Sequence, residues 1–237
     1  MKFIKGLFKF LLSVVLVIAV AAGVIYYLIS SPGKEVDVTY TEKDFESYLE
    51  KGGIIFDENH ASAEDFFAGN VGATGEVPVS TVVTSEELTA IANKSMNENS
   101  VMENVKIKCV GEDEMIMSCE LGDISPLIDQ FPFLERFERG LKIVENKPIY
   151  MNATLFYDEN TQKFDGVTKE LYVGKVKIPT GQANDNLRPG GTALNRAIKN
   201  LEGFSVNSFK VTEEGFNFDG TIPEKIESQG NFEDLNY

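Results

Sequence analysis

The amino-acid sequence predicts an α+β domain behind an N-terminal transmembrane helix. An uncharged apolar segment lies near the N-terminus, and the rest of the chain alternates capped helical stretches with strands joined by short polar turns. A capped helix followed by a hairpin occurs twice, at 84–121 and 192–222, either as a duplicated unit or as a chance recurrence of a common motif. Strands joined by hairpins form antiparallel sheets that can cover helices on one face, which defines the α+β class.

The expected anchor is the segment from Phe10 to Ile29. Its twenty residues carry no charge and would span about 30 Å as a helix, enough to cross a bilayer. Three lysines precede it and only Lys34 follows before a long acidic run, which predicts a cytoplasmic N-terminus and an extracytoplasmic C-terminal domain. We expect Tyr26 and Tyr27 at the outer interface. A signal peptide cleaved near residues 19–21 is the alternative, but the apolar run continues to Ile29, which favours a retained single-pass anchor.

The strongly acidic composition bears on the partners of the protein. The chain has 37 acidic and 22 basic residues and a net charge of −15. Such a chain repels nucleic acid and anionic headgroups at long range, so we expect no nucleic-acid partner. The simplest role of the charge is to keep the domain soluble and off the membrane surface; a site for a cation or a basic partner is the alternative.

The residue types present argue against an enzyme. His60 is the only histidine and lies in a polar run, where we expect a solvated loop, which argues against histidine-dependent triads and histidine metal clusters. Paired carboxylates stay open as an alternative, because 37 acidic residues offer many accidental pairs. No phosphate-binding loop, dinucleotide fingerprint or nucleophile-elbow motif occurs. The acidic turns at 112–114 and 158–160 do not match a full calcium loop, and exposed hairpin turns explain them. We expect no catalytic residue, no cofactor and no metal site.

The chain divides into three parts by pattern. Residues 1–33 form the cytoplasmic tail and anchor, 34–75 a membrane-proximal helix and an irregular linker, and 76–237 the extracytoplasmic α+β domain. The membrane-proximal helix is expected between a Thr41 cap and Gly52.

The elements of the α+β domain follow from capping signals and two-residue periodicity. A capping box at 84–87 opens a helix, and its apolar residues fall on one face: Leu88, Ile91, Ala92 and Met96. The further elements are a strand at 77–83, a hairpin around 112–114, a helical stretch from 125 to 140, long strands at 149–157 and 164–178, a helix from 192 to 203 and a hairpin around 213–215.

Two cysteines flank the first expected hairpin. Cys109 and Cys119 each share the parity of apolar neighbours, so both thiols are expected on the apolar face. One disulfide across the ladder and two buried free thiols are equally compatible with this pattern, and in both cases their role is structural.

A proline-interrupted helical stretch provides the candidate lipid-binding residues. A helix broken at Pro132 rarely packs all of its apolar residues against one flat surface, so it could form the wall of a hydrophobic groove; ordinary core packing is the alternative. The candidates are Leu127, Ile128, Phe131, Phe133, Leu134 and Phe137.

The stretch "LYVGKVKIP" at 171–179 changes the parity of its apolar residues at Gly174. Leu171 and Val173 occupy one parity, and Val176 and Ile178 the other. A β-bulge at Gly174 would absorb the extra residue and let the sheet bend, so we expect a structural role for this glycine and a curved sheet.

The order of elements resembles a known family. The "SEELTAIANK" helix, the hairpin, the long strands ending in "LYVGKVKIP", the "ALNRAIKN" helix and the last hairpin "FKVTEEGFNFDG" resemble YpmS-like membrane-anchored proteins of Gram-positive bacteria. More loosely they resemble LmeA-like extracytoplasmic lipid-binding proteins. The resemblance covers residues 76 to 226 and implies a strongly curved antiparallel sheet wrapped around a helix, similar to tubular lipid-binding folds, with an interior able to hold an acyl chain.

Two functions from different classes remain open at this stage. The first is a membrane-anchored carrier or binder of lipids or other amphiphiles in the cell envelope. The second is a non-enzymatic interaction or scaffolding subunit that meets an envelope protein partner through its acidic face.

Overall fold

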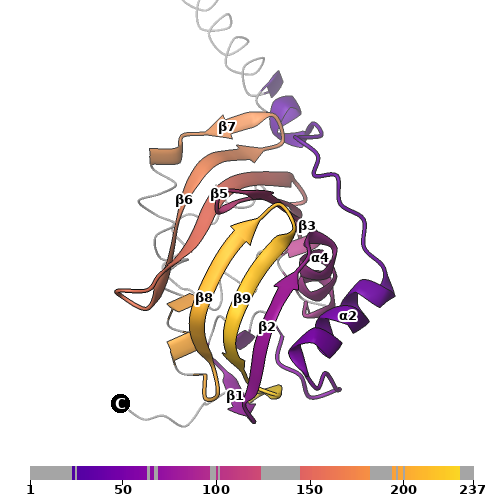
Figure 1. Cartoon of the computed structure of the whole chain (residues 1–237). Coiled ribbons are helices and arrows are strands. Elements are labelled where there is room, and N and C mark those ends of the chain that lie inside the picture. Colours follow the sequence, from indigo (N-terminus) through magenta and orange to yellow (C-terminus); the bar gives the residue numbers. More distant parts are fainter. Residues whose placement is uncertain are drawn as a thin grey trace, which may run out of the picture.

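The α+β class is confirmed by the computed structural model, whose paired strands all run antiparallel (Figure 1). The structure describes residues 23–24, 26–62, 65–66, 69–96, 100, 102–123, 145–181, 194–195, 197–199 and 201–229. Most of the expected anchor lies outside this part of the chain. Within these ranges no helix combines the length and the apolar character needed to cross a membrane.

The largest sheet is a five-stranded meander. Its strands, in spatial order, are β3 (Met102–Gly111), β4 (Glu114–Leu121), β5 (Pro148–Asp158), β6 (Lys163–Val173) and β7 (Val176–Ile178). Met117, Met151 and Leu171 lie opposite one another on neighbouring strands and so share one face. Tyr150 and Tyr172 lie on the other face. Apolar residues therefore occur on both faces of this sheet.

The remaining strands form a three-stranded sheet and a two-stranded ribbon. The order in the first is β2 (Val77–Val83), β9 (Gly215–Ile222) and β8 (Ser205–Thr212). The ribbon pairs β1 (Val71–Thr74) with β10 (Lys225–Ser228), and Figure 1 shows it at the opposite end of the molecule from β7.

The turn between β3 and β4 joins the two larger sheets. The backbone N–H of Asp113 donates to the Val211 carbonyl of β8 over 3.1 Å, and the Asp113 carboxylate accepts from the Val211 N–H over 3.2 Å. The Asp113 carbonyl also accepts from Leu155 N–H of β5 over 2.8 Å. The expected exposed acidic turn is thus a structural joint, in which the Asp113 carboxylate pairs with backbone.

The helices α2 and α4 both begin with a capping box at the threonine expected from the sequence. In α2 (Glu42–Gly52), Asp44 closes the box on Thr41, and Gly53 ends the helix in the left-handed region with φ 60°. In α4 (Ser85–Lys94), Glu87 closes the box on Thr84. Carboxylates in the first turn also favour the positive end of the helix dipole.

A polar face of α4, which the sequence analysis did not predict, covers the edge of the large sheet. The Thr89 hydroxyl accepts from Ile107 N–H over 3.0 Å and donates to the Ile107 carbonyl over 3.2 Å. Asn93 bonds both backbone groups of Val105 in the same manner, and Ser85 accepts from the Cys109 N–H. Side chains at every fourth position of α4 thus form hydrogen bonds with the backbone of alternate residues in β3. Without α4, these backbone groups at the edge of the sheet would be unpaired.

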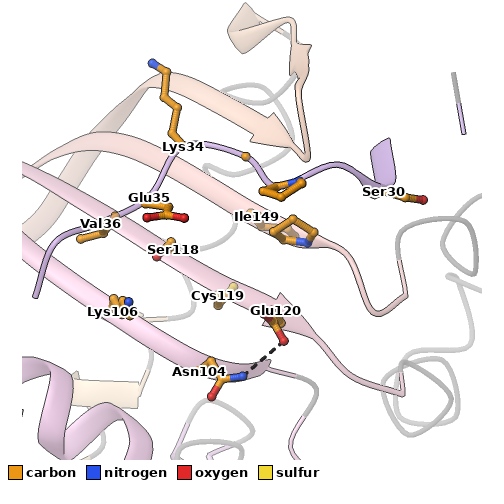
Figure 2. A pocket seen from close by; sticks show the side chains of 13 residues that line it. Ser30, Lys34, Glu35, Val36, Asn104, Lys106, Ser118, Cys119, Glu120 and Ile149 are labelled. Carbon is orange, nitrogen blue, oxygen red and sulfur yellow. Dashed lines mark hydrogen bonds between the residues drawn. The ribbon is translucent and has the colours of Figure 1, made fainter. Parts of the chain in front are cut away.

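An extended strap, residues 31–40, leads to α2 (Figure 1), and its first half passes over strands β3 to β5 (Figure 2). Val36 and Val38 are 3% and 6% exposed and pack with Tyr150. The Lys34 ammonium pairs with Glu170 and lies 4.9 Å from the centroid of the Tyr150 ring. Because α2 also packs on α4 and β1 pairs with β10, the part of 34–75 that is described belongs to the folded body.

Gly174 lies in a hairpin turn, so the predicted bulge at this position is wrong. Val173 pairs with Val176 and Leu171 with Ile178, leaving Gly174 and Lys175 as a two-residue loop. The parity changes because the chain reverses there, and paired residues of the two strands still share one face. Gly174 has φ +57° and Lys175 has no positive φ, the pattern of a type II′ turn with glycine first.

A register shift between β5 and β6 occurs elsewhere. Asn152 pairs with Glu170 and Ala153 with Thr168, which leaves Lys169 as the extra residue in β6. A bulge bends its strand and increases its twist, so this effect occurs in β6 near Lys169 and not at Gly174.

Candidate hydrophobic binding site

A hydrophobic cavity of about 340 Å³ lies between the two larger sheets and the helices α2 and α4. Val79, Thr81 and Val83 of β2 reach it by the two-residue alternation of one strand, and Leu155 reaches it from β5. Six phenylalanines line it: Phe66, Phe164, Phe204, Phe209, Phe216 and Phe218.

Ring contacts hold the aromatic wall together across the two sheets. The ring centroids of Phe164 on β6 and Phe209 on β8 lie 5.0 Å apart, with the rings edge to face. Phe209 and Phe216 make a similar contact at 5.2 Å. Edge-to-face pairs at this separation are favourable beyond the area they bury, so the wall is a defined surface.

The charged group in the lining of this cavity, Lys51, comes from α2 and is already paired. The Lys51 ammonium lies 2.7 Å from a carboxylate oxygen of Glu87 and donates to the Val82 carbonyl over 2.9 Å. Ser47 donates to the same carboxylate over 2.6 Å. Burial raises the pKa of Glu87, but hydrogen bonds from Lys51, Ser47 and Thr84 outweigh it and hold the pKa below its ordinary value.

Tyr48 completes the polar side of the cavity as a neutral phenol. Burial raises its pKa, and the neighbouring Glu87 carboxylate raises it further. The ion pair of Lys51 and Glu87 together with this phenol gives the lining no net charge among the described residues. The cavity is thus suited to an apolar chain.

The cysteines are free thiols. Cys109 pairs with Met115 and Cys119 with Ile149, so the two occupy the apolar face at separate positions along the strands. Of the two alternatives drawn from the sequence, the structure has the buried free thiols. Burial raises the pKa of Cys109, and it raises the pKa of Cys119 to about 11, so both thiols stay protonated and unreactive at neutral pH.

His60 is not the solvated loop residue expected from its neighbours. Its ring stacks on Phe56 with centroids 3.6 Å apart, and Nδ1 lies 2.5 Å from the Asp57 carbonyl oxygen. The residue also bridges to Glu227 of β10. Among the described residues, no group of three or more histidines, cysteines or acidic residues could hold a metal ion.

A second hollow, of about 600 Å³, lies between the strap and strands β3 to β5 (Figure 2). Glu35 and Lys106 line it, and Asn104 donates to Glu120 across its floor over 3.2 Å. Because both signs of charge are present, its electrostatics favour no single class of ion. We therefore take the hydrophobic cavity as the candidate site.

The candidate residues predicted for lipid binding, from Leu127 to Phe137, lie outside the described residues. Sequence reasoning missed the phenylalanines that do line the cavity. The alternation of Phe216 and Phe218 on one parity of the last hairpin was the available signal.

Comparisons with protein-family models, with curated proteins and with solved structures found no match to this chain. The resemblance to YpmS-like proteins therefore rests on the order of elements and on short motifs.

Proposed function

We propose that this protein is a membrane-anchored, extracytoplasmic binder of lipids or other amphiphiles that holds an apolar chain in the cavity between its sheets. The observation that carries the proposal is a cavity of about 340 Å³ lined by six phenylalanines and no unpaired charge among the described residues. Small-molecule sites commonly measure about 300–1,000 Å³ and are mostly apolar.

The energetics favour an alkyl chain as the occupant. Each methylene removed from water contributes about 0.8 kcal/mol, so roughly ten buried methylenes contribute about 8 kcal/mol before the entropic cost of binding. An ionised headgroup inside the cavity would find Lys51 already neutralised by Glu87, so such a group is better placed outside.

The finer expectation about shape belongs to the same proposal. We infer that the curved sheet wraps around helices, in the manner of tubular lipid-binding folds. The contacts that the large sheet makes with β8 and with α4 support this inference, because they leave the cavity between the layers.

Photo-crosslinking in reconstituted membranes tests the proposal. The full chain is placed in vesicles of phosphatidylcholine that carries a diazirine in one acyl chain, irradiated and mapped by peptide mass spectrometry. Adducts are expected within 205–222, which includes Phe209 and Phe216, in addition to adducts in the anchor. Adducts in the anchor alone would contradict the proposal.

Two tryptophan variants on one strand provide the control. Thr81 lines the cavity, whereas its neighbour Ser80 is exposed and points away from it. Thr81→Trp is expected to fill the cavity and remove the adducts within 205–222 while anchor adducts persist. Ser80→Trp is expected to leave the adducts within 205–222 and the anchor adducts unchanged. A protein without cavity adducts that retains a stoichiometric envelope partner would instead favour the interaction-subunit function.

A further inference from the structure

The end of the anchor segment is fastened directly to the β6–β7 hairpin. The Lys175 N–H donates to the Leu28 carbonyl over 2.9 Å. Gly174 lies so close to the helix end that a Cβ there would be 2.1 Å from the Ile29 carbonyl oxygen. The Ser31 hydroxyl donates to the Tyr27 carbonyl over 2.7 Å. The helical residues 26–30 thus meet the folded body with no spacer between them.

Aromatic and cationic side chains gather at this junction. Tyr26 and Tyr27 are 62% and 67% exposed. The Lys147 ammonium lies 5.0 Å from the Tyr26 ring centroid, and Lys175 stands exposed at the tip of the hairpin. Lys177 is paired with Glu170, but no acidic group of the described chain forms an ion pair with Lys147 or Lys175.

We propose that this junction, made of the β6–β7 hairpin with Lys147, Lys175, Tyr26 and Tyr27, rests on the bilayer and contacts the phosphates of anionic lipids. The inference rests on the proposed anchor. Tyrosines concentrate at membrane interfaces, and a lysine near an anionic surface strengthens attachment about fivefold. This end of the domain is therefore held on the membrane surface, in contrast to the expectation that charge keeps the whole domain away from it.

The orientation places the hydrophobic cavity away from the bilayer. Gly52, Ile54 and Ile222 line the cavity near α2 and the end of β9, whereas β7 lies at the opposite end of the molecule in Figure 1. A lipid chain in the cavity has therefore left the membrane, which fits a carrier better than a protein that merely grips bilayer lipid.

Single-tryptophan quenching tests which end faces the bilayer. The chain contains no tryptophan, so Lys177→Trp beside the hairpin and Lys210→Trp on β8 each introduce one reporter at an exposed strand position. The full chain is reconstituted in nanodiscs of brominated phosphatidylglycerol and phosphatidylcholine. Quenching is expected at position 177 and not at 210. Equal quenching at both positions, or none at 177, would overturn the proposed orientation.

Charge removal tests the lysine contacts separately. Lys175→Gln keeps the backbone N–H that donates to the Leu28 carbonyl. In phosphatidylglycerol nanodiscs it is expected to lower the ratio of molecules with the hairpin on the bilayer to molecules with the hairpin off it about fivefold, as measured by quenching of the tryptophan at position 177. Lys210→Gln in the same reporter background is expected to change nothing. An unchanged signal with Lys175→Gln would refute the phosphate contact. A chain that fails to enter nanodiscs would instead contradict the anchor, and with it the proposed function.

Discussion

Replacement of Thr89 by valine is expected to weaken the attachment of α4 to the edge of the large sheet. Thr89 is fully buried, and its hydroxyl serves both the N–H and the carbonyl of Ile107. Valine has nearly the same shape but neither donor nor acceptor. The substitution therefore removes two hydrogen bonds without opening a cavity, and leaves two backbone groups of β3 without partners.

The expected cost follows from those two backbone groups. An unpaired buried donor or acceptor costs about 1–3 kcal/mol. Ile107 is only half-buried, so water reaches it in part, and the lower half of the range applies. Two such groups together give an expected loss of about 2–4 kcal/mol in the free energy of unfolding. For a chain of this size that corresponds to a fall of about 4–16 °C in the thermal midpoint.

Thermal unfolding followed by circular dichroism measures the effect, and Thr89→Ser is the matched control. Serine keeps the hydroxyl and loses one methyl group, which costs about 1 kcal/mol. The order of stability is expected to be wild type, then serine, then valine. A valine variant as stable as the serine variant, or more stable, would refute the role of the hydroxyl at this edge.

Three further outcomes follow from the structure. Gly174→Val is expected to lower the thermal midpoint, because φ +57° and the Ile29 carbonyl leave no room for a side chain; an unchanged midpoint would contradict this. Glu87 has a lowered pKa in the folded state, so its stabilisation is present above its ordinary pKa of about 4.3 and is lost as pH falls through the folded value. Glu87→Gln removes the ion-pair partner of Lys51 and should therefore destabilise the folded protein at pH 7. The difference in thermal midpoint between the variant and the wild type should narrow in acid, and a difference that widens in acid would contradict this prediction. Cys119, with a pKa of about 11, is expected to resist iodoacetamide at pH 8 until the chain unfolds, and labelling of the folded protein at the unfolded rate would show the thiol to be accessible.

Several elements could be predicted because their signals are local. Both capping boxes occur where Thr41 and Thr84 predicted them, since such a box involves residues three apart. The long hairpin of β5 and β6 follows from two-residue alternation on either side of a polar turn. The error at Gly174 shows the limit of this approach. A bulge and a tight hairpin produce the same change of parity, and only the pairing of Val173 with Val176 distinguishes them.

The candidate site was less accessible to sequence reasoning. Phe164, Phe209 and Phe216 come from three strands, and nothing in the order of residues says that their rings meet. The polar face of α4 was missed for a related reason, because a buried Thr89 is favourable only when the backbone of β3 lies within hydrogen-bonding distance.

The sequence by itself determined the class of the fold, the starts of α2 and α4 and the β3–β4, β5–β6 and β8–β9 hairpins, because capping and side-chain periodicity act over a few residues. Only the tertiary structure decided which surfaces meet. Asp113 and Val211, which join the two sheets, are 98 residues apart, and the hydrophobic cavity exists only between the layers that such contacts bring together. Hydrogen bonds of this kind depend on where the backbone lies in space, which residue spacing along the chain does not specify.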